Sequence, residues 1–149
     1  MSTLLTRLDR GGLLVRLLLA WICAGHVITG LAALISDERG LQFGALLYGA
    51  VFDPSPQFLY IIRPLGVYIL ALAYLQAMAV RDPWRYRAVI DVTLAVFAAR
   101  QVQRYLFSEE IQATFGMSGD QHILRSLYFL LLAALLLVGR LRLGQEAGA

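Results

Sequence analysis

The chain has 149 residues, of which 59% are hydrophobic and 15% are charged, and its mean hydropathy is +0.67. Soluble domains carry about 25% charged and about 45–50% apolar residues, so this composition argues against a soluble, disordered or coiled-coil protein. The formal net charge is only +3, and the 13 basic residues, all of them arginine, form no long run. We therefore expect a protein that lies in lipid and has no nucleic-acid partner.

Four apolar runs reach the length of about 20 residues that a helix needs to cross a bilayer. They cover residues 13–35, 57–80, 83–107 and 122–141. The alternating pattern of a membrane β-barrel is absent. We predict an all-α fold, a four-helix transmembrane bundle that forms one integral membrane domain over residues 1–149. The first run is longer than the apolar core of about 7–15 residues in a signal peptide, so we expect an uncleaved anchor.

Short polar sequences mark the expected helix starts. Asp53-Pro54 and Ser55-Pro56 both precede the second run, and Asp82-Pro83 precedes the third. An N-cap side chain followed by proline at the first helical position is typical of a helix start, because proline lacks only an N–H that would be unpaired there. Asp120 is the expected cap of the fourth run.

The distribution of arginine predicts the orientation. Eight of the 13 arginines lie at the N-terminal side of the first run, at the turn between the second and third, or at the end of the fourth: Arg7, Arg10, Arg16, Arg81, Arg85, Arg87, Arg140 and Arg142. The opposite connections hold Arg39 and several acidic residues. By the positive-inside rule we expect a multi-pass inner-membrane protein with both termini in the cytoplasm.

The connection between the first two runs contains a second apolar stretch, residues 41–52, which is too short to span. We expect an interfacial or re-entrant segment there. Two interpretations stay open, an apolar loop on the bilayer surface and a lid over a functional site.

Several basic side chains fall at membrane depth, where an unpaired charge costs several kcal/mol. At about 1.5 Å per residue, His26, Arg63, Arg100 and Arg104 are expected about 13, 9, 10 and 5 Å below the outer ends of their helices. Because these four side chains fall in one layer, we predict a pocket in the outer leaflet. The candidate ligand-binding residues are His26, Arg63, Arg100, Arg104, Tyr60 and Gln103.

Two other interpretations of these arginines stay open. Arg104 and Arg125 can reach the head groups by snorkelling, or the arginines can pair with acidic residues of the outer connections. For Arg63 and Arg100, which lie deeper, a pocket or a paired network is favoured over snorkelling, and guanidinium groups suit phosphate and carboxylate. Asp91, near the inner end of its run, is expected to interact with the helix dipole and with Arg87.

The predicted function is that of an accessory or binding protein, with catalysis less favoured, that holds a lipid, quinone or anionic head group in the basic pocket. The alternatives are a membrane redox subunit or enzyme that uses the same pocket, and a small oligomeric transporter. Two histidines and a single cysteine provide no evident metal or haem set, whereas a quinone is a possible cofactor. Membrane lipid, a larger membrane complex or further copies of the chain are the expected partners.

Residues 57–107 contain Arg63-Pro64-Leu65-Gly66-Val67-Tyr68, an apolar helix, the basic turn Arg81-Asp82-Pro83-Trp84-Arg85-Tyr86-Arg87 and a third helix that ends in arginines. This arrangement resembles the DoxX-like small bacterial membrane proteins. The resemblance implies a four-helix bundle with Arg63 and Gly66 at the entry of one helix. It also implies an association with respiratory or thiol-redox complexes, although Cys23 alone provides no dithiol.

Overall fold

The structure, a computed structural model, describes residues 10–35, 42, 45, 51 and 55–146, and this part of the chain contains helices and no strands. The helices are α1 (Arg10–Ile35), α3 (Pro56–Arg81), α4 (Arg87–Leu106), α5 (Ser108–Phe115) and α6 (Gly119–Glu146). The all-α prediction is confirmed, and each predicted run overlaps one long helix over most of its length. The short α5 was not predicted. Apart from Gln42, Ala45 and Val51, the predicted interfacial segment 41–52 lies outside the described residues.

Three of the helices are long and apolar enough to cross a membrane. Their spans are Gly12–Ile35, Pro56–Arg81 and Gly119–Leu143, with mean hydropathies of 2.1, 1.8 and 2.0. Large apolar side chains such as Trp21, Leu65 and Leu131 lie exposed along them, which is the surface that lipid covers. The chain is therefore a membrane-spanning protein. α4 is outside this class because it carries several charged residues along its length.

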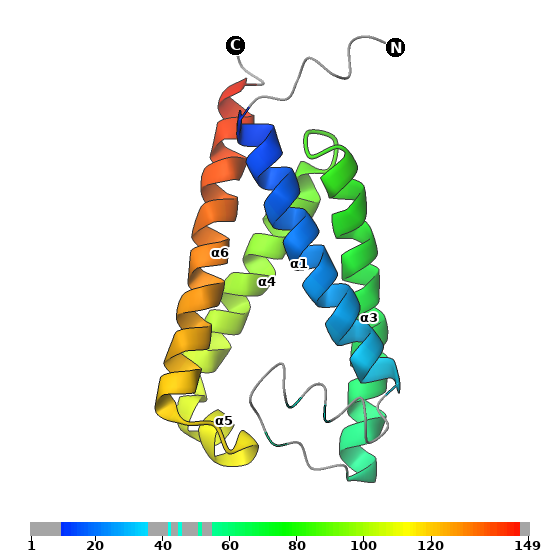
Figure 1. Ribbon diagram of the computed structural model, residues 1–149, viewed down its shortest axis with the longest axis vertical. Coiled ribbons are helices and arrows are strands. Elements are labelled where there is room, and N and C mark those ends of the chain that lie inside the picture. The colour runs from blue at the N-terminus through cyan, green and yellow to red at the C-terminus, as the bar shows by residue number, and fades with distance from the viewer. Residues whose placement is uncertain (1–9, 36–41, 43–44, 46–50, 52–54, 147–149) are drawn as a thin grey trace.

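The long helices form two pairs that lie close at one end and diverge toward the other (Figure 1). α1 packs against α3 over much of its length, and α6 packs against α4 and against α1. The start of α1, the α3–α4 turn and the end of α6 lie at the close end, which we call the turn end (Figure 1). The opposite end, which carries α5, is called the α5 end.

The apolar core fills the region where the helix pairs lie close together. Val15 and Leu19 of α1, Ile90 of α4 and Leu136 and Leu143 of α6 are fully buried there. Farther from the turn end, Phe97 and Phe129 join α4 to α6 in an edge-to-face contact with their ring centroids 5.7 Å apart. Such ring pairs add to the stabilisation from burial itself.

The α1–α3 pair is close because glycines face each other. A Cβ atom added to Gly66 would lie 2.8 Å from the backbone oxygen of Gly30 and 3.0 Å from the Cβ of Ala33. Helix pairs in membranes use small residues in this way because van der Waals contact is the main attraction available there. Gly66, which belongs to the segment that resembles DoxX-like proteins, therefore has a packing role.

The helix starts confirm one predicted cap and correct two. Ser55 caps α3, with its side chain accepting a hydrogen bond from the Phe58 amide, and Pro56 follows as expected. The alternative start, Asp53-Pro54, lies outside the described residues. Asp82 does not start a helix. It follows α3, its Oδ1 accepts a hydrogen bond from the amide of Arg85, and α4 begins only at Arg87. The reversal between two antiparallel helices uses the residues that were predicted to begin the second.

Asp120 is also not the cap predicted for α6. Ser118 Oγ accepts a hydrogen bond from the amide of Gln121, and Gln121 Oε1 accepts one from the amide of Ser118. This reciprocal pair is a capping box, which satisfies two backbone N–H groups at once. Asp120 stays in the first turn, where its charge favours the helix dipole.

Candidate functional site

His26 belongs to a chain of hydrogen bonds that joins three helices. Its Nδ1 lies 2.8 Å from Gln76 Oε1 of α3, and Gln76 Nε2 donates to Thr93 Oγ1 of α4 at 3.1 Å. The Thr93 hydroxyl donates to the carbonyl oxygen of Val89 at 2.8 Å. Gln76 and Thr93 are fully buried. His26 therefore interacts with the neighbouring helices, and its partner lies in the half of α3 near the turn end.

The hydrogen bond to Gln76 places His26 far from Arg63. Gln76 lies about 20 Å farther along α3 than Arg63, at 1.5 Å per residue. The expectation of one layer that holds both His26 and Arg63 differs from this arrangement. It assumed parallel helices with aligned ends, whereas α1 is inclined to α3 and does not reach the level where α3 begins (Figure 1).

Arg63 and Tyr60 share a site of their own. They line a shallow open depression of about 490 Å³ on α3, together with Pro56, Leu59 and Pro64. Both side chains are exposed. An aromatic ring beside a guanidinium group near the end of an apolar helix is typical of the membrane interface.

Gln103 lines a different depression. It is exposed on α4, and its neighbours there are Phe107, which precedes α5, and four residues of α5: Glu110, Ile111, Thr114 and Phe115. Arg100 is exposed and lies one turn before Arg104 on the helix stripe that continues from Thr93 and Phe97. Neither of these two depressions contains His26, Arg100 or Arg104.

Arg104 is the most deeply buried of the predicted basic residues. Its side chain is only 9% exposed. Its Nε donates to Ser126 Oγ of α6 at 3.3 Å, and the Ser126 hydroxyl donates to the carbonyl oxygen of His122 at 3.0 Å. The Arg104 side chain therefore links α4 to α6. This contact differs from simple snorkelling, in which the guanidinium group reaches for the head groups alone.

Two polar side chains beside Arg104 carry buried nitrogen atoms without a hydrogen-bond partner among the described residues. These atoms are Nε2 of Gln101, one turn before Arg104, and Nε2 of His122, which is 7% exposed. His122 and Arg104 are close enough to interact electrostatically. A buried polar atom without a partner costs about 1–3 kcal/mol. The cluster of Gln101, Arg104, His122 and Ser126, which we call the α4–α6 cluster, thus has unused hydrogen-bonding capacity.

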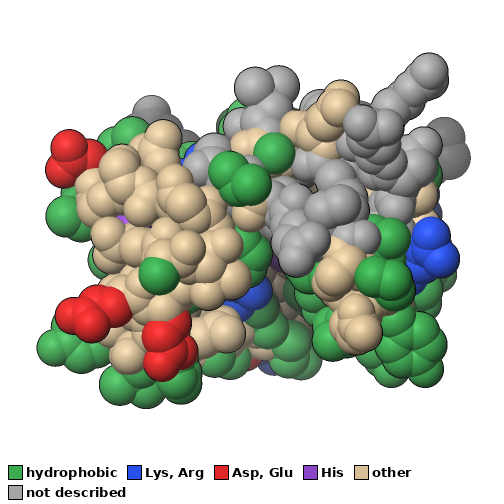
Figure 2. All heavy atoms as spheres, turned by 90° about the horizontal axis from the view of Figure 1, so that it is seen from below, with side chains coloured by type: hydrophobic (Ala, Val, Ile, Leu, Met, Phe, Trp, Pro, Cys, Tyr) green, Lys and Arg blue, Asp and Glu red, His purple; other side chains and the backbone are tan. Residues whose placement is uncertain are grey.

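Charged side chains are distributed unevenly between the two ends. Glu109, Glu110 and Asp120 are exposed at the α5 end, where Figure 2 shows acidic side chains gathered on the side that carries α5 and the start of α6. At the turn end, Asp91 of α4 pairs with Arg140 of α6, with Nε–Oδ1 and Nη2–Oδ2 distances of 2.9 and 3.0 Å. The prediction that Asp91 interacts with Arg87 is wrong. Arg140 is the partner instead, because α6 passes beside α4 at this level.

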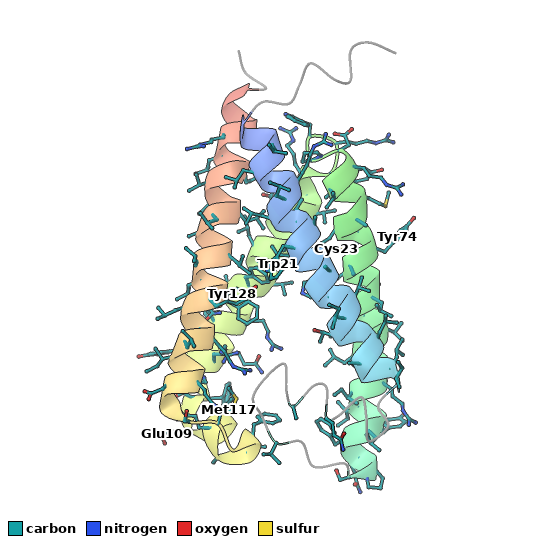
Figure 3. The ribbon with its side chains drawn as sticks, viewed as in Figure 1. Trp21, Cys23, Tyr74, Glu109, Met117 and Tyr128 are labelled. Carbon is teal, nitrogen blue, oxygen red and sulfur yellow. The ribbon has the colours of Figure 1, made fainter. Side chains whose placement is uncertain are left out.

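A polar contact also joins α1 to α6. Trp21 Nε1 donates to the hydroxyl of Tyr128 at 2.6 Å, and Figure 3 shows the two rings pointing toward each other where these helices begin to diverge. Trp21 is 63% and Tyr128 is 42% exposed. The contact therefore lies at the surface of the molecule, apart from the buried chain at His26.

Gln76, Thr93 and Ser126 were not among the predicted site residues. A usable signal was present for Gln76, an uncharged amide at helical spacing from the small residues Gly66 and Ala73, on the face of α3 that becomes buried. Ser126 follows His122 by one turn, so it lies on the same helix face. Pairing across helices cannot be read from either position alone.

A scan against models of protein families, a search of curated proteins and a search of solved structures found no significant match to this chain. The resemblance to DoxX-like proteins accordingly stays a prediction from the quoted motifs.

Proposed function

We propose that this membrane protein binds an anionic lipid head group at the α4–α6 cluster. The observation that carries the proposal is a buried arginine flanked by two buried nitrogen atoms that have no described partner, Gln101 Nε2 and His122 Nε2. Guanidinium, amide and imidazole N–H groups are all donors, and phosphate or carboxylate oxygens are the acceptors that match such a set.

The position of the cluster supports a lipid as the source of the anion. His122 lies in the first turns of α6, about 5 Å from the start of the apolar span Gly119–Leu143. Lipid phosphates lie just beyond the hydrocarbon, within reach of side chains at that depth. A head group can therefore meet the cluster while its acyl chains remain beside the apolar surfaces of α4 and α6.

We also propose that α4 is a fourth membrane-spanning helix, so that the four long helices form a transmembrane bundle. At about 1.5 Å per residue, α4 is about 30 Å long, which matches the hydrocarbon thickness. Two of its charged residues, Asp91 and Arg104, contact α6, which lowers the cost of placing them in the membrane. Arginine-rich segments at the turn end support an orientation with both termini in the cytoplasm of a bacterial inner membrane.

Binding can be measured as thermal stabilisation of the purified full-length protein in detergent. We expect phosphatidylglycerol to raise the Tm more than phosphatidylcholine, and inorganic phosphate to raise it little. Arg104→Gln should remove the difference between the lipids, whereas Arg142→Gln, the same change at an exposed site of the turn end, should preserve it.

Loss of folding in Arg104→Gln is separated from loss of binding by a second variant. Gln101→Leu removes an unpartnered donor and no described hydrogen bond, so the fold should be retained while the lipid effect weakens. Equal stabilisation by both lipids in the wild type, or an unchanged difference in both variants, would refute the proposal. Stabilisation by inorganic phosphate alone would assign the cluster to a free anion.

A further inference from the structure

The hydrogen-bond chain that starts at His26 fixes which ring nitrogen carries the proton. The carbonyl oxygen of Val89 can only accept, so the Thr93 hydroxyl donates to it, and Thr93 Oγ1 is left to accept from Gln76 Nε2. Gln76 therefore turns its carbonyl oxygen toward His26. Because an amide oxygen has no hydrogen to give, His26 Nδ1 must be the donor in the 2.8 Å contact.

A neutral imidazole with its hydrogen on Nδ1 has a lone pair on Nε2. No described residue forms a hydrogen bond with this atom, and the ring is only half-buried. The preceding residue, Gly25, has no side chain, and a Cβ added to it would meet nothing within 4 Å, so the surface of α1 next to His26 is open there. His26 thus presents a hydrogen-bond acceptor partway along a membrane-spanning helix, where a polar atom without a hydrogen-bond partner is costly.

We infer that His26 Nε2 accepts a hydrogen bond from the hydroxyl group of a neutral, membrane-soluble ligand, an alcohol or a phenol. An anion does not fit the neutral ring, because a carboxylate or phosphate oxygen would face another acceptor. A neutral hydroxyl group on an apolar body supplies the missing donor and avoids placing a charge at this depth. This site is independent of the α4–α6 cluster, which takes the opposite kind of group.

The chain offers a direct spectroscopic test because it has only two histidines, His26 and His122. Full-length protein labelled with ¹⁵N-histidine is placed in detergent micelles, and the imidazole ¹⁵N shifts report tautomer and hydrogen bonding. The probes are 4-octylphenol and its methyl ether, 4-octylanisole, which share an apolar body and differ in the donor. The variant His26→Gln assigns the two sets of signals.

We expect His26 to show a hydrogen on Nδ1, and its Nε2 signal to move upfield with the phenol and stay in place with the ether. Gln76→Leu removes the group that fixes the tautomer, and it should weaken phenol binding about two- to tenfold, the effect of one hydrogen bond. Gln57→Leu, the same change at an exposed site of α3, should leave binding unchanged.

Three results would overturn the inference. They are a hydrogen on Nε2 in the wild type, equal shifts with phenol and ether, and an Nε2 signal that is already hydrogen-bonded without a probe, which would assign the site to water or to another part of the chain. A Gln76→Leu variant that fails to fold leaves the wild-type comparison of phenol and ether decisive.

Discussion

Asp91 and Arg140 form a two-point salt bridge that joins α4 to α6 near the turn end. Two parallel N–H···O bonds fix the relative rotation of the two helices more firmly than a single contact between point charges. The same helices are joined a second time by Arg104 and Ser126, toward the α5 end. The polar contacts thus hold α4 to α6 on both sides of their aromatic contact.

Asp91→Asn should lower the stability of the protein modestly. Asp91 is half-exposed, so solvent screens the pair, and we expect a loss of about 0.5–1 kcal/mol in the free energy of unfolding. A double-mutant cycle with Asp91→Asn and Arg140→Gln, read by thermal unfolding in detergent, measures the coupling. Arg142→Gln serves as the control. A coupling energy of zero would show that the two-point geometry adds nothing at this interface.

Gly66→Ala should destabilise the α1–α3 pair. The new methyl group would lie 2.8 Å from a backbone oxygen of Gly30, which cannot turn aside as a side chain can. Overpacking of this kind costs about 1–3 kcal/mol, more than the helix propensity that alanine restores. Thermal unfolding in detergent should therefore show a lower Tm.

Gly25→Ala is the matched control on the partner helix. Its Cβ meets nothing within 4 Å, so alanine should be neutral or slightly stabilising. A Gly66→Ala protein as stable as Gly25→Ala would mean that α1 and α3 can separate without cost.

The sequence predicted the long helices well and the site only in part. Apolar runs of about 20 residues define α1, α3 and α6 because lipid imposes that length on any span. The start of α4 was misassigned at Asp82, which lies in the turn before that helix, and the cap of α6 was assigned to Asp120 in place of Ser118. His26 and Arg104, two of the predicted site residues, form hydrogen bonds to other helices, whereas the ligand-binding role of the predicted set stays a prediction. Their partners depend on helix tilt, which periodicity within one helix does not contain.

Thr93→Val should test the buried chain at His26 by removing only a hydroxyl group. Valine keeps the shape, but Gln76 Nε2 loses its acceptor while fully buried. We expect a loss of about 1–3 kcal/mol in the free energy of unfolding, measured by thermal or chemical denaturation in detergent. Thr114→Val, at an exposed site on α5, should have little effect. Equal stability of the two variants would mean that the amide finds another partner.

The proposed orientation can be tested by cysteine labelling of intact cells. Cys23 donates its weak hydrogen bond to the carbonyl oxygen of Ala73, and Cys23→Ser keeps a donor there while removing the thiol. In this background, a cysteine at exposed Thr114 on α5 should react with a membrane-impermeant maleimide.

A cysteine at exposed Arg85, in the α3–α4 turn, should react with the same reagent only after the cells are permeabilised. The two sites lie at opposite ends of the molecule (Figure 1), so one of them must face each side if the helices cross the membrane. The reverse pattern would invert the orientation and place the α4–α6 cluster at the cytoplasmic surface. Labelling of both sites in intact cells would contradict a spanning arrangement, because the arginine-rich turn would then share a compartment with α5.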